Sequence, residues 1–175
     1  MPDSALPVYS VDASALIEMK EVYPGAVFQS MWEFIGKLGD QGRLVVAEQA
    51  KSECHDAVFA PWFAAHSEMV YSFSTELGEY VKALHAEIIP AGLPLIDAAS
   101  TKNQGDPFVV ALSLLLEGRD LTNLQTGASS TCRVVTYERN RNPGARLAKI
   151  RDVCDYYGID CLKWPDVFQL ESWSC

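Results

Sequence analysis

Four acidic residues stand at points where an apolar run gives way to a helix or a loop: Asp12, Glu53, Asp106 and Glu138. If the fold gathers them into one cleft, their like charges make it costly for all of them to ionise together. A divalent cation removes that cost, and carboxylate oxygens are ligands that suit Mg²⁺ or Mn²⁺. The sequence therefore suggests a metal site built from carboxylates that are far apart in the chain.

The surrounding elements predict that these acids can meet. Strands are predicted at four segments that alternate with helices: 7–12, 43–47, 132–138 and 159–164. Right-handed crossovers then favour a parallel sheet with helices on both faces, a three-layer α/β/α sandwich. Ligands of such sheets bind beyond the carboxyl ends of the strands. Asp12 and Glu138 close strands and Asp106 opens a helix, so we expect all three at that edge.

The remaining segments complete a single predicted domain, residues 1–175, with a helical insertion near 55–95. Glu53 is expected about two turns into the helix that follows the second strand, from where it can lean over the same edge. Helical spacing continues through 67–89. The polar segment 119–131 is expected to be a loop insertion, and residues 164–175 a short tail.

Each acid also has a structural interpretation. Asp12 can cap the helix that follows it, and Asp106 before a proline fits an N-cap. Glu53 can be an ordinary exposed helix residue, with Glu48 a first-turn partner of the helix dipole. Glu138 can pair with a neighbouring arginine in solvent.

Bulk composition narrows the class of protein. The 175 residues are 49% hydrophobic, which suits one folded domain and argues against disorder. The start, MPDSALPVYS, lacks the features of a signal peptide, and no apolar run approaches a membrane span. The five cysteines form no C-x-x-C pair, so we expect reduced thiols in a cytoplasmic protein without a zinc site.

Charge is distributed unevenly along the chain. The net charge of −9 argues against a general nucleic-acid coating protein. One stretch is nevertheless basic: between residues 133 and 151 stand Arg133, Arg139, Arg141, Arg146, Lys149 and Arg151, with Glu138 the only acid. This stretch is either a solvated face or a phosphate-binding rim beside Glu138.

Three segments resemble motifs of the PIN-domain nucleases: YSVDASALI, GDPFVVALSLLLEG and VVTYERNR. In the first, a strand runs into Asp12 and a small hydroxyl residue. In the second, Asp106 opens an apolar helix, and in the third a strand ends at Thr136, two residues before an acid. The interval from Val46 to Glu53 is similar to the family's remaining acidic motif. The resemblance covers most of the chain apart from 119–131 and the extreme tail.

The resemblance implies a Mg²⁺- or Mn²⁺-dependent endoribonuclease, in many relatives a VapC-type toxin held inactive by an antitoxin. Asp12, Glu53 and Asp106 would be the principal metal ligands, with Glu138 completing the cluster directly or through water. The supporting residues would be Ser14 and Thr136, and we place Arg139, Arg141 and Arg146 on the RNA backbone as candidates. Glutamate at position 138, where aspartate is usual in the family, leaves direct metal contact open.

Other functions remain open at this point. The acidic charge favours a catalytically inactive PIN-like binding or regulatory module as the main alternative. A DNA-directed nuclease is compatible with the same chemistry, and so is a homodimer formed through the apolar helices. A receiver-like phosphoacceptor is disfavoured, because YSVDAS carries one acid where adjacent acids are needed. No nucleophile–base pattern involves His55, His66 or His85, which argues against covalent hydrolysis.

Overall fold

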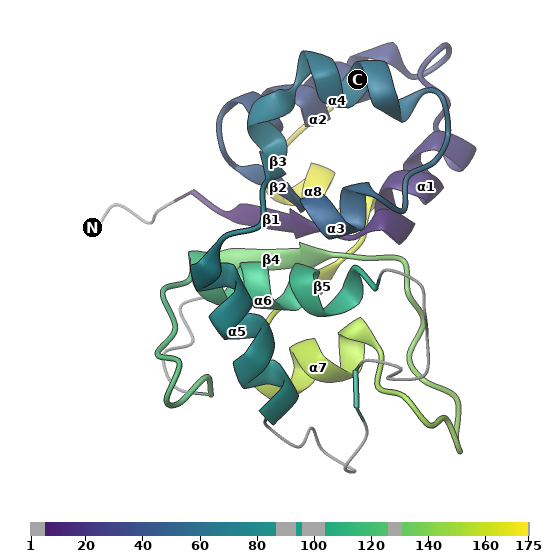
Figure 1. Ribbon diagram of the computed structural model, residues 1–175. Coiled ribbons are helices and arrows are strands. Elements are labelled where there is room, and N and C mark those ends of the chain that lie inside the picture. The colour runs from purple at the N-terminus through teal and green to yellow at the C-terminus, as the bar shows by residue number, and fades with distance from the viewer. Residues whose placement is uncertain (1–5, 87–93, 96–103, 126–130, 175) are drawn as a thin grey trace.

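Five short strands form one parallel sheet in the order β3-β2-β1-β4-β5, in a computed structural model that describes residues 6–86, 94–95, 104–125 and 131–174 (Figure 1). The strands are β1 (Val8–Val11), β2 (Leu44–Ala47), β3 (Val70–Tyr71), β4 (Cys132–Val135) and β5 (Cys161–Leu162). β1 is central, and Ser10 pairs with Val45 on one side and Val134 on the other. The parallel α/β class expected from the sequence is confirmed.

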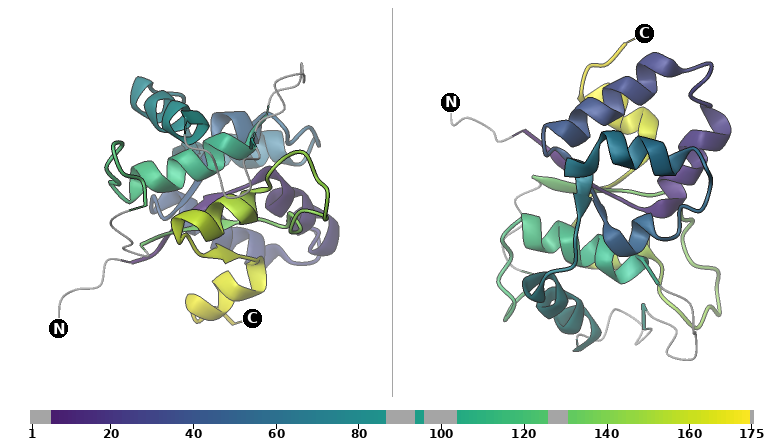
Figure 2. Two further views of the ribbon diagram at one scale, coloured as in Figure 1. Left: turned by 90° about the horizontal axis from the view of Figure 1, so that it is seen from below. Right: turned by 45° about the horizontal axis from the view of Figure 1, so that its top comes forward.

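Helices cover both faces of the sheet (Figures 1 and 2). One layer contains α1 (Ala13–Val22), α2 (Gln29–Asp40), α4 (Phe59–Ala65) and α8 (Trp164–Leu170). The other contains α5 (Thr75–Ala86), α6 (Asp106–Leu116) and α7 (Ile150–Tyr157). The four-residue helix α3 (Glu48–Lys51) follows β2, and a 3₁₀ turn, η1 (Ser67–Met69), precedes β3.

The sheet and α6 form the centre of the core. β2 is buried along its whole length, and α6 buries almost every side chain from Pro107 to Leu114. Ser10 donates a hydrogen bond to the carbonyl of Val109 at 2.9 Å, which fixes α6 against β1. This contact sets where the first residue of α6 stands at the edge of the sheet.

The strand order creates a reversal between β1 and β4. The chain leaves β1 toward the α1 layer, whereas it leaves β4 toward α7 on the opposite face (Figure 2). At such a reversal the two connections separate and open a crevice, which is where α/β proteins bind their ligands. Asp12 directly follows β1, and residues 136–138 directly follow β4.

Several sequence expectations were wrong in detail. Residues 67–89 were expected to be one helix, but 67–71 form η1 and β3, α5 begins at Thr75, and 87–89 lie outside the described residues. The expected tail is helix α8, whose Trp164 is fully buried and donates its indole N–H to the Ala15 carbonyl at 2.8 Å. The helix expected after β2 stops at Lys51. The described parts of 119–131 contain neither helix nor strand, as expected of a loop.

Gly118 and Gly158 end α6 and α7 in the left-handed conformation, with φ near +65° at both. Glycine adopts this conformation without the steric cost of a Cβ. The described residues contain no helix with the length and apolar character needed to cross a bilayer.

Candidate active site

Asp12 stands at the carboxyl end of β1 and is 2% exposed. It occupies the N-cap position of α1, yet its side chain makes no capping hydrogen bond. Its Oδ2 atom instead accepts hydrogen bonds from the hydroxyls of Ser14 and Thr136, the latter at 2.9 Å. The simple capping interpretation is therefore wrong, and the carboxylate is held by one hydroxyl from the first turn of α1 and one from the residue after β4.

Backbone donors orient both hydroxyls toward Asp12. Ser14 Oγ accepts the Tyr137 N–H at 3.0 Å, and Thr136 Oγ1 accepts the Glu138 N–H at 3.1 Å. Each hydroxyl oxygen accepts the backbone N–H through a lone pair, and its own O–H remains to donate to the carboxylate. These bonds tie the end of β4 to the end of β1.

Glu53 lies two residues beyond α3, not inside a helix as expected. Its Oε1 atom accepts the Gly105 N–H at 2.6 Å, just before α6. A Cβ on Gly105 would stand 2.8 Å from that oxygen and 3.0 Å from Ala50 Cα, so glycine permits the close approach. Gly105 is the N-cap of α6 and Asp106 is its first residue, so Asp106 itself is not the cap.

Glu138 is held by the start of α7. Its Oε1 atom accepts a hydrogen bond from Lys149 Nζ at 2.7 Å, and its Oε2 atom accepts the Ile150 N–H at 3.0 Å. Pairing with Arg139 or Arg141 was the expected structural alternative, and it is wrong. Sequence reasoning placed Lys149 in the basic stretch but missed its contact with Glu138.

The four acids interact electrostatically. Burial raises the pKa of Asp106 to about 7, with further contributions from Glu138, Asp12 and Glu53 and an opposing one from Lys149. Burial also raises the pKa of Asp12 despite the two hydroxyl donors, and Glu138 and Glu53 add to the rise. The neighbouring thiol responds to the same charges: burial, Asp12 and Glu53 raise the pKa of Cys54 to about 12. This edge of the sheet therefore concentrates negative charge.

Within the described residues, no three His, Cys, Asp or Glu side chains lie close enough together to hold a metal ion as they stand. Glu53 and Glu138 are turned toward N–H donors. The donor set nevertheless fits a hard cation. Among the described residues, nothing donates a hydrogen bond to Asp12 Oδ1, Glu53 Oε2 or the Asp106 carboxylate, so oxygen atoms at this edge remain available.

The three arginines predicted to bind RNA do not form one group. Arg139 lines a pocket beside Glu138. Arg141 pairs with Asp152, with Nε 3.5 Å from Oδ1, and lines a different pocket. Arg146 is exposed and in neither pocket.

The fold and this edge define a parallel α/β protein whose acidic residues gather at its topological switch point. Residues 9–175 match the family described as a domain of unknown function (DUF4411), and the chain belongs to that family. No curated protein and no solved structure matches the chain significantly.

Proposed function

We propose that this protein is a Mg²⁺- or Mn²⁺-dependent nuclease, and that its substrate is RNA, as the resemblance to PIN-domain nucleases implies. The observation that carries the proposal is the poorly compensated negative charge at the crevice: buried Asp12 and half-buried Asp106 both have raised pKa values. A charge cluster of this kind is costly unless a cation or a proton neutralises it.

Asp12, Asp106 and Glu53 would hold the metal, and Glu138 would contribute directly or through water. A bound divalent cation supplies an activated water and neutralises charge on the phosphoryl oxygens. Ser14 and Thr136 hold the Asp12 carboxylate in one orientation, so that Oδ1 faces away from the hydroxyls. Lys149 fixes Glu138 and partly offsets the negative charge on Asp106.

The toxin–antitoxin setting belongs to the same proposal. The resemblance implies an antitoxin partner, whereas the homodimer is proposed from the apolar helices and the cytoplasmic location from the expected reduced thiols. Single-stranded or looped RNA is the favoured substrate, because unpaired nucleotides expose their backbone and base edges. A DNA substrate is chemically equivalent at phosphorus and is distinguished by direct comparison.

The test is cleavage of a mixed panel of RNAs, with matched DNAs, in the presence of Mg²⁺ or Mn²⁺. We expect internal cleavage that requires the cation and is abolished by Asp12→Asn. Asp160→Asn is a matched control, because Asp160 is an exposed aspartate whose described partner is Arg133, away from the crevice. Folded protein that cleaves no member of the panel with either cation would contradict the proposal.

A catalytically inactive PIN-like binding module is the second candidate. The observation that favours it is the engagement of both Glu138 oxygens, by Lys149 and by the backbone of α7. Nucleic-acid binding that needs no divalent cation and leads to no cleavage would select this function.

A further inference from the structure

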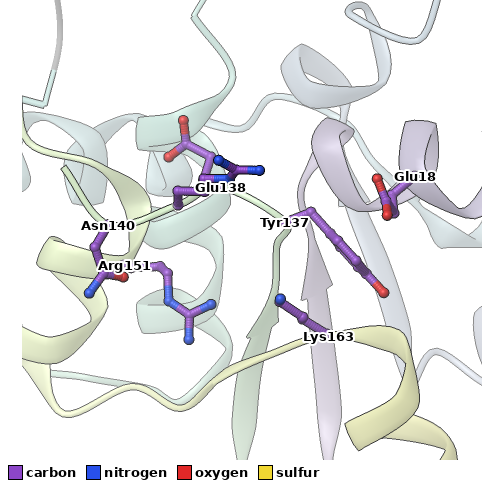
Figure 3. A pocket seen from close by; sticks show the side chains of 7 residues that line it. Glu18, Tyr137, Glu138, Asn140, Arg151 and Lys163 are labelled. Atoms are coloured by element: carbon purple, nitrogen blue, oxygen red, sulfur yellow. The ribbon is translucent and has the colours of Figure 1, made fainter. Parts of the chain in front are cut away.

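A pocket of about 430 Å³ opens beside Glu138, near the carboxyl ends of β4 and β5 (Figure 3). It is lined by Glu18, Tyr137, Glu138, Arg139, Asn140, Arg151 and Lys163. Four of these follow β4, Arg151 lies on α7, Lys163 precedes α8, and Glu18 comes from α1 on the other face. The volume falls in the range of pockets that bind small molecules, roughly 300–1,000 Å³.

The cations of this pocket lack ion-pair partners in the described parts of the chain. Elsewhere, seven basic residues are paired with acids: Lys20, Arg43, Lys82, Arg119, Arg133, Arg141 and Lys149. Arg139, Arg151 and Lys163 form no ion pair there, and Lys163 Nζ lies over the Tyr137 ring, 5.5 Å from its centroid. In a chain of net charge −9, three unpaired cations in one pocket are a specific arrangement.

Two of these cations converge on one space. In Figure 3 the Arg151 guanidinium and the Lys163 ammonium point into the pocket from opposite walls. The Glu138 carboxylate is turned away from them, toward Lys149 and the start of α7. Like charges that face each other without a carboxylate between them raise the energy of the empty pocket and favour an anionic ligand.

We propose that this pocket binds the phosphate of a nucleotide that adjoins the bond cleaved at the acid cluster. Its position relative to a cleaved bond rests on the proposed nuclease function, whereas phosphate binding itself does not. Arg151 and Lys163 hold the phosphate, since guanidinium and ammonium donors match its oxygens. Tyr137 and Asn140 provide a ring face and an amide for the attached ribose or base, which an inorganic ion would not use.

Binding is measured without cleavage, in EDTA, by the fluorescence anisotropy of a labelled single-stranded 12-mer of uridylate. We expect the double variant Arg151→Gln/Lys163→Gln to weaken binding at least 10-fold. The slope of log affinity against log salt concentration should fall by about 1.4, for two lost phosphate contacts on a single strand. Thermal melting of each variant verifies that it is folded.

The matched control removes two exposed charges outside the pocket, one on α2 and one on α5, with Lys37→Gln/Lys82→Gln. We expect its affinity to stay within about twofold of the parent protein, because distributed surface charges contribute little at physiological salt. Equal weakening in both double variants would overturn the proposal, since binding would then depend on overall charge. Unchanged binding in the pocket variant would overturn it as well.

A competition experiment shows whether the bound phosphate belongs to an RNA strand or to a free nucleotide. The dinucleotide UpU, with one internal phosphodiester, should displace the labelled 12-mer, and uridine without phosphate should not. UMP binding that depends on Arg151 and Lys163 but leaves the 12-mer in place would overturn the proposal in favour of a free-nucleotide site.

Cleavage assays keep this proposal separate from the proposed function. If the parent protein cleaves RNA, the pocket variant should raise KM with little change in kcat. If the parent protein cleaves nothing but the pocket variant still loses 12-mer affinity, the nuclease proposal fails and the phosphate pocket stands.

Discussion

Two carboxylates at opposite ends of the sheet, Asp12 buried and Glu171 partly buried, have pKa values shifted in opposite directions. Near the amino ends of β1 and β2, Glu171 accepts hydrogen bonds from Tyr9 and Arg43, both at 2.5 Å. Burial opposes ionisation of Glu171, but these two partners outweigh it and lower its pKa. At the carboxyl end, Asp12 meets hydroxyls and other acids, and its pKa is raised.

The difference separates a structural carboxylate from one for which we propose a functional role. Glu171 is compensated within the chain and connects the end of α8 to the sheet. The cluster of Asp12, Glu53 and Asp106 is left undercompensated, and such charge is favourable only when something outside the chain completes it. Pairing alone does not lower a carboxyl pKa: Glu117 pairs with Arg119 at 2.6 Å, and burial still raises the pKa of Glu117.

The largest expected effect is on activity, and it comes from substituting Asp12 at the carboxyl end of the sheet. Asp12→Asn should lower kcat for RNA cleavage by roughly 100-fold or more, because removing a metal ligand removes transition-state stabilisation. The free energy of unfolding of the metal-free protein should stay the same or rise, because the substitution removes a carboxylate that Glu138 and Glu53 repel. An Asp12→Asn variant that keeps the kcat of the parent protein would contradict the role of Asp12 as a metal ligand. A variant that unfolds more readily than the metal-free parent protein would contradict the repulsion.

The second prediction concerns the stability contributed by Glu171 near the amino ends of β1 and β2. Glu171→Gln should lower the free energy of unfolding by about 2–3 kcal/mol, because Arg43 and Tyr9 lose a charged hydrogen-bond acceptor. Urea unfolding measures the loss, and kcat at a temperature where the variant is folded should be unchanged. A variant as stable as the parent protein would show that this network does not stabilise the fold.

Thr136→Val sharpens the account of how Asp12 is held. Losing the hydroxyl that donates to Oδ2 should lower metal affinity or kcat by about 10-fold, as is usual for partners that orient a metal ligand. Ser113→Ala is the control, because it removes another buried hydroxyl, bonded to the Val110 carbonyl, away from the crevice. Equal losses of activity in the two variants would refute a specific role for Thr136.

The last prediction concerns the pH dependence of stability. The pKa of Asp106 is about 7 in the fold and near 4 in an unfolded chain, so the folded state keeps its proton longer. Stability of the metal-free protein should therefore fall as pH rises from about 4 to 7, changing Tm by roughly 2–4 °C for each kcal/mol. Asp106→Asn should reduce this slope, as should saturating Mn²⁺; identical slopes with and without the substitution would contradict the assignment.

The sequence predicts correctly those elements that short-range hydrophobic patterns and turn residues determine. Asp12 at the end of a strand and Asp106 at the start of an apolar helix both follow from hydrophobic patterning and one proline. Sequence reasoning missed β3, because two residues show no period and their neighbours Met69 and Phe73 fit a helical spacing. It read α8 as a tail, because the burial of Trp164 depends on packing against α1, far away in the sequence.

The contacts within the candidate site were harder to predict than the fold, because they also join residues that are far apart in the sequence. The partner of Glu138 is Lys149, eleven residues away across an irregular loop whose path no periodicity reveals. Glu53 was placed near the correct edge through an expected helix that does not exist, since α3 has only four residues. Likewise, Lys163 stands beside Arg151 only because β5 adds to the edge of the sheet.

Mn²⁺ binding observed directly in a crystal tests the central claim. The account predicts one bound ion or more at the ends of β1 and β4, with Asp12 Oδ1 and an Asp106 oxygen roughly 2.1 Å from it. Glu53 should turn its free oxygen toward the same ion. Mn²⁺ bound only elsewhere on the protein, or Asp12 and Asp106 unchanged at saturating Mn²⁺, would contradict the account.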